Sequence, residues 1–470
     1  MERDVKLLDE WGYEVTTSSQ LCISAINHYY HQVLSYGKKR CVILEALAHD
    51  KDCVLANILA AHFLYSSDPS RASSCLEAAK SQLDRATMYE KHVFDAISYI
   101  ITRDRDDEIA CELHSKLLKE FPRDLVSLKR AQVLCFYMGR PDLSLSLVLQ
   151  VLSQNEGQNY VYGMLSFSFL EVGRMNDAEE AAKRGYKINK HDIWAQHALC
   201  HVFQYQCRLK EAVKFMEGCS SSWSSCSSFM LTHNWWHVAL CYLEGNAPMK
   251  RVLEIYDHYI WKELDKTDAV SAEVYLNAAG LLLRLCVRGE MDTIGDRLKI
   301  LAECLTDQAN WYIDWHLDVL TVWALAKTGE FCKAEDLLKG IKHRISRMTK
   351  KKQQLMLQGT VLAEALYAYG KGNDKHGLEI LGPDFDANGY KMIGASDEQL
   401  DVFNEVWYTM LLNSGEAMKA IEVIEKRIKK REGIPFLWRL LGRGYKLLTQ
   451  WSEASVANEK ARALECAYFQ

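Results

Sequence analysis

The sequence predicts an all-α protein built as an α-solenoid, which is a superhelix of antiparallel helix pairs. Three observations predict it: apolar residues recur with helical spacing, small residues recur every 34 residues, and the 470 residues include only six prolines. Proline interrupts helices, so its scarcity favours long helical segments. A chain of this length exceeds what one hydrophobic core usually organises, whereas a stack of repeats buries its apolar faces between neighbours.

Residues 1–100 are expected to form a helical cap on this stack. The segments LCISAINHYYHQVL and VLANILAAHFLY have helical apolar patterns but fit the 34-residue period poorly. The terminal sequence MERDVKLLDEWGYE carries charges where a signal peptide needs an apolar run, and no segment is apolar for long enough to span a membrane. We therefore expect a cytoplasmic protein with no membrane partner.

Residues 101–220 are expected to form helix-turn-helix repeats. A small residue ends the first helix of each unit, and a second small residue five positions later lets the second helix approach closely. The turn residues, each 34 apart, are Gly139, Gly173 and Cys207, and the packing residues, with the same period, are Ala110, Ser144, Ala178 and Ala212.

Residues 221–300 are expected to hold irregular repeats. The Ser- and Cys-rich sequence CSSSWSSCSSFM, from Cys219 to Met230, intervenes before the next helix and directly precedes HNWWH. We interpret it as an irregular insertion that could act as a lid. Cys219 and Cys226 do not have the spacing of a usual zinc pair, so the fifteen cysteines are interpreted mostly as buried, reduced thiols.

Residues 301–470 are expected to return to the repeat. The same five-residue step and 34-residue period link Gly329 with Ala334, Gly415 with Ala420, and Thr449 with Ala454. The last unit fits the W-x2-L-G-x2-Y pattern of tetratricopeptide repeats, followed by two alanines, at Trp438, Leu441, Gly442, Tyr445, Ala454 and Ala461. The sequence therefore predicts a tetratricopeptide-repeat-like solenoid.

Two histidine pairs carry the clearest chemical signal. They are His197 with His201 in HALCH, and His233 with His237 in HNWWH. Residues four apart lie on one face of a helix, so each pair can direct two imidazoles to one point. The 34-residue count places the first pair on the concave face of its repeat, and the second pair lies on the next first helix along the chain. Because neighbouring helices pack about 8 to 10 Å apart, the four rings can converge.

Such a group can hold a divalent metal ion. Zinc, iron(II) or manganese(II) suits several imidazoles with a carboxylate, with an open position for water. Additional or indirect ligands are expected at His316 and Asp314 in YIDWH and at Asp257 in EIYDHYI. Thr232 is expected to cap the second histidine helix, and a helix N-terminus would keep His233 neutral. The alternative is that these histidines pack and hydrogen-bond between repeats without any metal.

The blocks WAQHALCHVFQ, RLKEAVKFMEG, THNWWHVALCYLEGN, EIYDHYIW and YIDWHLD resemble the tetratricopeptide repeat protein 38 family. The resemblance runs from about residue 20 to the C-terminus and is most specific at the paired histidines. It implies a helical-repeat fold without an established activity. Gln204 departs from the family pattern, in which other members carry an acid at this position.

Two functions from different classes remain open at this stage. The first is a solenoid whose concave groove binds a protein, a peptide or a small ligand, which is the usual role of this architecture. The second is a metal-dependent enzyme or small-molecule binder built around the four histidines. The formal charge of -5 supplies no strong positive field, so no nucleic-acid partner is expected.

Overall fold

The computed structural model describes residues 5–102 and 104–469, which form two compact units. The first unit comprises Met1–Leu199 and Ser222–Ser227, and the second comprises Cys200–Ser221 and Ser228–Gln470. The boundary falls inside one continuous helix, α11, so this helix contributes residues to both units. The four-part division expected from the sequence stays a prediction.

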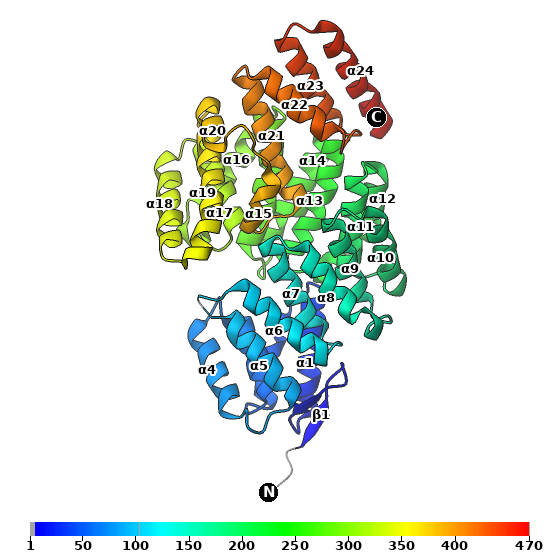
Figure 1. Cartoon of the computed structure of the whole chain (residues 1–470), viewed down its shortest axis with the longest axis vertical. Coiled ribbons are helices and arrows are strands. Elements are labelled where there is room, and N and C mark those ends of the chain that lie inside the picture. Colours follow the sequence, from blue (N-terminus) through cyan, green and yellow to red (C-terminus); the bar gives the residue numbers. More distant parts are fainter. Residues whose placement is uncertain (1–4, 103, 470) are drawn as a thin grey trace. The chain divides into compact units, whose positions relative to one another are not determined.

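The first unit begins with a short β-hairpin and continues with helices, as Figure 1 shows. Its elements are β1 (Lys6–Leu8), β2 (Glu14–Thr16), α1 (Gln20–Leu34), α2 (Ile43–His49), α3 (Val54–Leu64), α4 (Pro69–Ser81), α5 (Met88–Ile100), α6 (Asp107–Glu120), α7 (Leu125–Met138), α8 (Pro141–Val151), α9 (Asn159–Glu171) and α10 (Met175–Ile188), followed by α11 (Ile193–Tyr205). Short 3-10 helices lie at Arg40–Val42 and Leu152–Gln154, and a third, Ser220–Ser225, crosses the boundary between the units in the sequence.

The second unit contains helices and no strand among its described residues. Its helices are α12 (Leu209–Cys219), α13 (Ser228–Glu244), α14 (Met249–Ile255), α15 (Ser271–Val287), α16 (Met291–Leu305), α17 (Trp315–Lys327), α18 (Phe331–Ser346), α19 (Lys350–Gly370), α20 (Asp374–Leu381), α21 (Asp397–Asn413), α22 (Ala417–Ile428), α23 (Pro435–Leu447) and α24 (Trp451–Tyr468). A π-helix at Tyr256–Ile260 extends α14, and 3-10 helices lie at Trp261–Asp265, Gln308–Asn310 and Ala387–Ile393.

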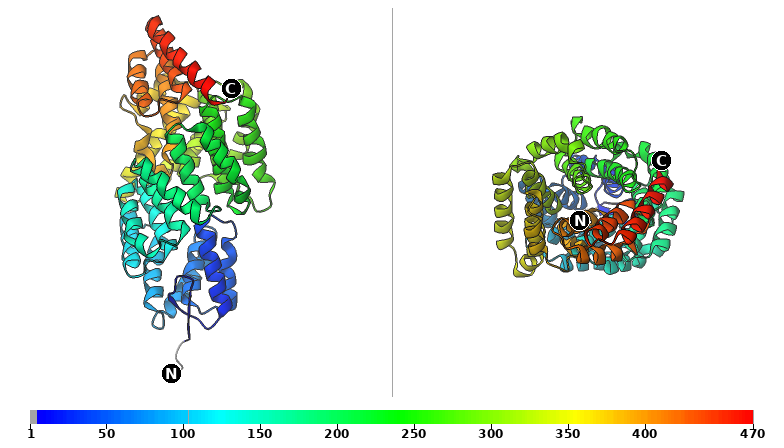
Figure 2. Two further views of the ribbon diagram at one scale, coloured as in Figure 1. Left: turned by 90° about the vertical axis from the view of Figure 1, so that its right-hand side faces the viewer. Right: turned by 90° about the horizontal axis from the view of Figure 1, so that it is seen from above.

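Successive helices pack as antiparallel pairs, which confirms the predicted all-α, tetratricopeptide-like solenoid. In the first unit α6 packs on α7, α8 on α9, and α9 on α10. In the second unit the run from α21 to α24 packs in the same consecutive way, and both runs can be followed in Figures 1 and 2.

The turns occur where the 34-residue period predicts them. Gly139 ends α7 with φ 63°, a left-handed conformation that lets the chain reverse directly after the helix. The other predicted turn residues also have positive φ, namely Gly173, Cys207, Gly329, Gly415 and Thr449. Ala178, five residues after Gly173, is fully buried, as are its counterparts Ala212 and Ala334. The 34-residue period therefore marks both the turn residue and the small residue at which the two helices of a unit pack closely.

The N-terminal region contains one feature that the sequence analysis did not predict. Strands β1 and β2 pair antiparallel in a hairpin, with Lys6 opposite Thr16. The Asp9 carboxylate accepts hydrogen bonds from the backbone N–H groups of Trp11 and Tyr13, at 3.0 and 2.9 Å, and holds the turn. Three-residue strands are too short to give a recognisable alternation of apolar and polar residues.

The Ser-rich insertion is more ordered than its composition suggests. Ser220–Ser225 form a 3-10 helix, and the Trp223 side chain within it is fully buried. Its indole Nε1 donates a hydrogen bond of 2.8 Å to the Gln196 side chain of the same unit. A buried aromatic anchor of this kind fixes the segment, and a lid function for the insertion stays a prediction.

Candidate metal centre

Helices α11 and α13 each carry one histidine pair, and the two histidines of a pair lie one helical turn apart. His201, His233 and His237 belong to the second unit, and His197 lies one turn before His201 on the continuous helix α11. The four residues are almost completely inaccessible to solvent, with exposed fractions between 0 and 3%. His197 and His201, which the sequence analysis placed on the concave face, are therefore buried in the interior.

The four imidazoles form one cluster. Each offers a ligand atom, and these four atoms all lie within 4.8 Å of one another. The ring of His237 is central, since its centroid lies 4.4 Å from that of His201 and 4.7 Å from that of His233. The structure thus brings together all four histidines that the sequence analysis singled out.

Three of the rings are oriented by oxygen atoms at Nδ1. His233 Nδ1 lies 2.8 Å from Asn277 Oδ1. His237 Nδ1 lies 2.5 Å from Gln204 Oε1, and His201 Nδ1 lies 2.8 Å from Glu398 Oε2. An imidazole Nδ1–H that donates to an oxygen has its basic lone pair on Nε2, which is the arrangement typical of histidine metal ligands.

The orientation of the Asn277 amide is itself fixed. Its Nδ2 donates to Thr232 Oγ1 at 2.9 Å and to the Glu273 carbonyl at 3.2 Å. Because both amide protons are used, Oδ1 is the atom that faces His233, and it can only accept. His233 therefore carries its proton on Nδ1.

Burial keeps His233 in the neutral form. Removal from water, together with the nearby His201, lowers its pKa to about 4, and the hydrogen bond with Asn277 opposes this only in part. The sequence analysis predicted the same protonation state, but the reason it gave, a helix N-terminus at Thr232, is wrong. Thr232 is not an N-cap, since α13 begins at Ser228 and Thr232 Oγ1 donates to the Ser228 carbonyl at 2.7 Å inside the helix.

Glu398, at the start of α21, joins the cluster to a buried ionic network. Burial alone would raise the pKa of its carboxyl group, but the neighbouring His201, with Arg431, brings this pKa below its ordinary value. The backbone carbonyl of Glu398 accepts a hydrogen bond from Arg284 Nη2. Glu398 thus contacts a cluster histidine through its side chain and an arginine through its backbone.

The three additional candidates lie outside the four-histidine group. His316, on α17, is buried, and burial, with the nearby His233 and Arg284, lowers its pKa to about 3. Asp314 is the N-cap of α17 and accepts the backbone N–H of Leu317 at 2.9 Å. Asp257 forms a two-bond ion pair with Arg297, at 2.8 and 2.7 Å. The group of four close ligand atoms includes none of these three residues.

Sequence reasoning missed the oxygen partners Asn277 and Glu398. Each lies on a helix far along the chain from the histidine that it contacts, and neither belongs to a motif. Gln204 was noticed only as a departure from the family pattern. In the structure its amide oxygen takes the place of an acid, because it accepts from His237 as a carboxylate would.

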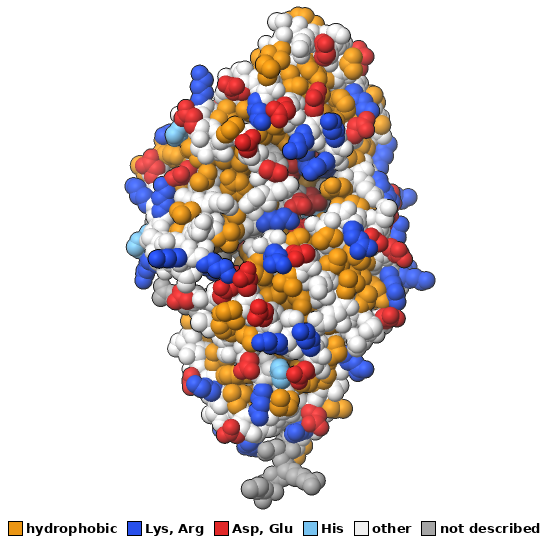
Figure 3. All heavy atoms as spheres, viewed as in Figure 1, with side chains coloured by type: hydrophobic (Ala, Val, Ile, Leu, Met, Phe, Trp, Pro, Cys, Tyr) orange, Lys and Arg blue, Asp and Glu red, His pale blue; other side chains and the backbone are white. Residues whose placement is uncertain are grey.

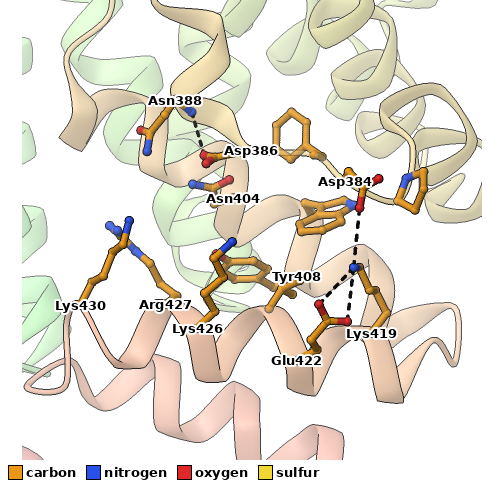
Figure 4. Close-up of a pocket in the computed structure, with 14 residues that line it drawn as sticks. Asp384, Asp386, Asn388, Asn404, Tyr408, Lys419, Glu422, Lys426, Arg427 and Lys430 are labelled. Atoms are coloured by element: carbon orange, nitrogen blue, oxygen red, sulfur yellow. Dashed lines mark hydrogen bonds and ion pairs between the residues drawn. The ribbon is translucent and has the colours of Figure 1, made fainter.

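A pocket of about 210 Å³ lies on the second unit, among residues of α21, α22 and the segment before α21. Figure 4 shows Lys426, Arg427 and Lys430 along one side of it, opposite Asp386 and Asn388. Arg427 is already paired with Asp401 at 2.9 Å. The pocket is a candidate for binding a small ligand or a peptide side chain.

No family model matches this chain. Two structures of the human IFIT1 dimer, one with m7Gppp-AAAA and one with PPP-AAAA, are 14% and 13% identical, with TM-scores of 0.39 and 0.40. The match covers 95% of this chain and 91% or 90% of theirs. A structure of Naa15/Naa10 bound to HypK-THB is 14% identical over 80% of this chain and 64% of that chain, with a TM-score of 0.25.

These likenesses transfer neither a ligand nor an activity, because the TM-scores lie below 0.5. The expectation that this chain binds no nucleic acid stays a prediction. On the face shown in Figure 3, acidic and basic side chains are interspersed, and neither sign dominates. No helix among the described residues is both long and apolar enough to cross a membrane.

Proposed function

We propose that this helical-repeat protein binds one divalent transition-metal ion through His197, His201, His233 and His237, as a metal-dependent enzyme or small-molecule binder. The observation that carries the proposal is the convergence of four buried imidazole ligand atoms within 4.8 Å. Zinc, iron(II) and manganese(II) all accept imidazole ligands. Membership of the tetratricopeptide repeat protein 38 family, suggested by the histidine blocks, belongs to the same proposal.

The oxygen partners support a metal role over simple packing. Packing requires only that each ring be surrounded, whereas Asn277 fixes the tautomer of His233, and Gln204 and Glu398 place an oxygen atom beside Nδ1 of His237 and His201. In a bound state the ion would polarise an oxygen atom of a small molecule or lower the pKa of a bound water. The protein itself would orient the imidazoles, exclude bulk solvent and keep His233 neutral.

Metal analysis of untagged protein tests the proposal. We expect one zinc, iron or manganese ion per chain in the wild type, and at least a tenfold lower content in His237→Ala. His114→Ala is the matched control, because His114 is equally buried but lies on α6 of the first unit, and this variant should keep its metal. Wild-type protein that holds no metal, even after reconstitution with each of the three ions, would overturn the proposal.

A second variant tests the oxygen partners. Asn277→Ala removes the acceptor of His233 Nδ1, and metal affinity should fall by about 10- to 100-fold. Asn155→Ala is the matched control, since Asn155 is also buried and donates to two backbone carbonyls in the first unit. Competition titration with a chromophoric chelator measures both affinities. Equal affinity in the two variants would mean that Asn277 has no role in metal binding.

Binding of a protein or peptide in the groove is a second candidate function, favoured by the pocket near Lys426 and Lys430. The metal analysis separates the two proposals. A protein that never takes up metal would leave the pocket as the better candidate for the functional site.

A further inference from the structure

Two buried basic side chains beside the histidine cluster have unused hydrogen-bonding atoms. Arg284, on α15, is 1% exposed and His316, on α17, is 2% exposed. Among the described residues, Arg284 Nε and Nη1 make no hydrogen bond, and neither do the two ring nitrogens of His316. Arg284 Nη1 lies 3.7 Å from Glu405 Oε2, which is beyond hydrogen-bonding distance.

A single residue separates Arg284 from the histidine cluster, and this holds for two different sets of contacts. Its guanidinium carbon is 5.7 Å from the ring centroid of Trp236. The Trp236 ring in turn lies 5.3 Å from the His233 ring and 5.0 Å from the His237 ring. The second set runs through Glu398, whose carboxylate contacts His201 and whose carbonyl accepts from Arg284.

His316 lies in the same region. Its ring centroid lies 6.1 Å from that of Phe403 on α21, the helix whose Glu398 carbonyl accepts from Arg284, and α17 packs on α15. Arg284 therefore borders the histidine cluster, and His316 lies on the neighbouring helix of the second unit. A buried guanidinium with unmade hydrogen bonds is costly, and native proteins usually satisfy such groups with water or a ligand.

The charges around the cluster indicate which kind of ligand would fit. The ion pairs that meet along α21 form two groups, together with the contact between Glu398 and His201, and their charges balance. The four cations are Arg284, Arg288, Arg427 and Arg431, and the four anions are Glu244, Glu398, Asp401 and Glu405. A divalent ion on neutral imidazoles adds two positive charges that no further acidic side chain of these groups offsets. Uncompensated buried charge is strongly unfavourable, so an anion should accompany the metal.

We infer that the centre binds a small oxyanion, of the size of a carboxylate or carbonate, between the metal ion and Arg284, with His316 alongside. This inference rests on the proposed metal function and names its ligand class. Guanidinium N–H donors match the oxygens of such an anion, and a transition-metal ion accepts one of those oxygens. The substrate of the centre would then be a molecule with a small carboxylate-like group.

Cobalt(II) reconstitution with acetate as the probe tests the inference. We expect acetate to shift the visible absorption of the cobalt protein in a saturable way. Arg284→Met should keep one cobalt ion per chain but bind acetate at least tenfold more weakly. Arg130→Met is the matched control, because Arg130 is another buried arginine with unused hydrogen-bonding atoms, in the first unit, and it should bind acetate as the wild type does.

Arg284→Lys provides a second variant in case Arg284→Met does not fold. Lysine keeps the positive charge but lacks the forked donors, so acetate affinity should lie between those of wild type and Arg284→Met. A cobalt-loaded wild type whose spectrum acetate does not change would overturn this inference alone. A wild type that cannot bind cobalt would overturn the proposed metal function as well, so the two failures are distinguishable.

Discussion

A buried histidine that stays neutral makes the folded state sensitive to acid. His114 is fully buried on α6, and burial, with the charge of Arg130, lowers its pKa from 6.5 to about 3. The unfolded chain therefore takes up this proton first as the pH falls. The stability that the neutral side chain preserves is complete above about pH 6.5 and is lost progressively between there and the folded pKa.

We predict that His114 alone accounts for a loss of about 1.4 kcal/mol in the free energy of unfolding between pH 7.5 and 5.5. His114→Leu should remove this contribution, because leucine has no proton to gain. Urea unfolding of the first unit's helices at the two pH values measures the effect. His233 and His316 remain in both proteins, so an unchanged pH dependence in the variant would contradict the prediction.

At the residue scale the sequence predicted the histidines but not their surroundings. His197, His201, His233 and His237 were found because helical spacing is local and can be read from the sequence. Asn277, Glu398 and Arg284 were not found, because their contacts depend on how distant helices pack. The helix N-terminus assigned to Thr232 was wrong because the Ser-rich segment before it already begins α13 at Ser228.

At the scale of helices, the repeat period predicted most of the architecture. A turn residue with positive φ and a buried small residue recur together, as Gly173 and Ala178 show. Gly442 shows why the signature of the last unit is specific: a Cβ atom there would lie 2.8 Å from Asn458 Nδ2 on α24. The hairpin of β1 and β2 escaped prediction because three-residue strands carry too little pattern.

Buried ion pairs join helices that the repeat period does not relate. Arg431, just after α22, binds both carboxylate oxygens of Glu244 on α13, at 3.1 and 2.9 Å. It also donates to the backbone carbonyl of Gln204 on α11 at 3.0 Å, and lies 3.6 Å from Asp401 on α21. One arginine thus connects the helices that carry the histidines with α21 and α22.

We predict that Arg431→Met destabilises the second unit by about 3 to 5 kcal/mol, because it leaves Glu244 buried without its partner. The double variant with Glu244→Met should lose much less than the sum of the single variants, since it removes both charges. Chemical unfolding in a double-mutant cycle measures the coupling. Additive losses would show that Arg431 and Glu244 do not act as a pair.

At the scale of the whole molecule, the second unit supplies most of the residues of the proposed metal site. The oxygen partners of the cluster come from α11, α15 and α21, and all three residues belong to the second unit. Helices α3, α4 and α5 of the first unit contribute nothing to the four-histidine group. A ligand that binds only the folded state stabilises the structure that forms its site.

Removing the metal should therefore loosen the second unit selectively. We predict that chelation increases amide hydrogen exchange in α11, α13, α15 and α21 and leaves α3 to α5 unchanged, because the former elements hold the histidines and their oxygen partners. At a free metal concentration one hundred times the dissociation constant, the lost stabilisation is about 2.7 kcal/mol. Exchange measured by mass spectrometry, with and without chelator, gives the pattern. A His237→Ala sample should show no response to chelator, and a uniform response across both units in the wild type would mean that the metal does not act through the cluster.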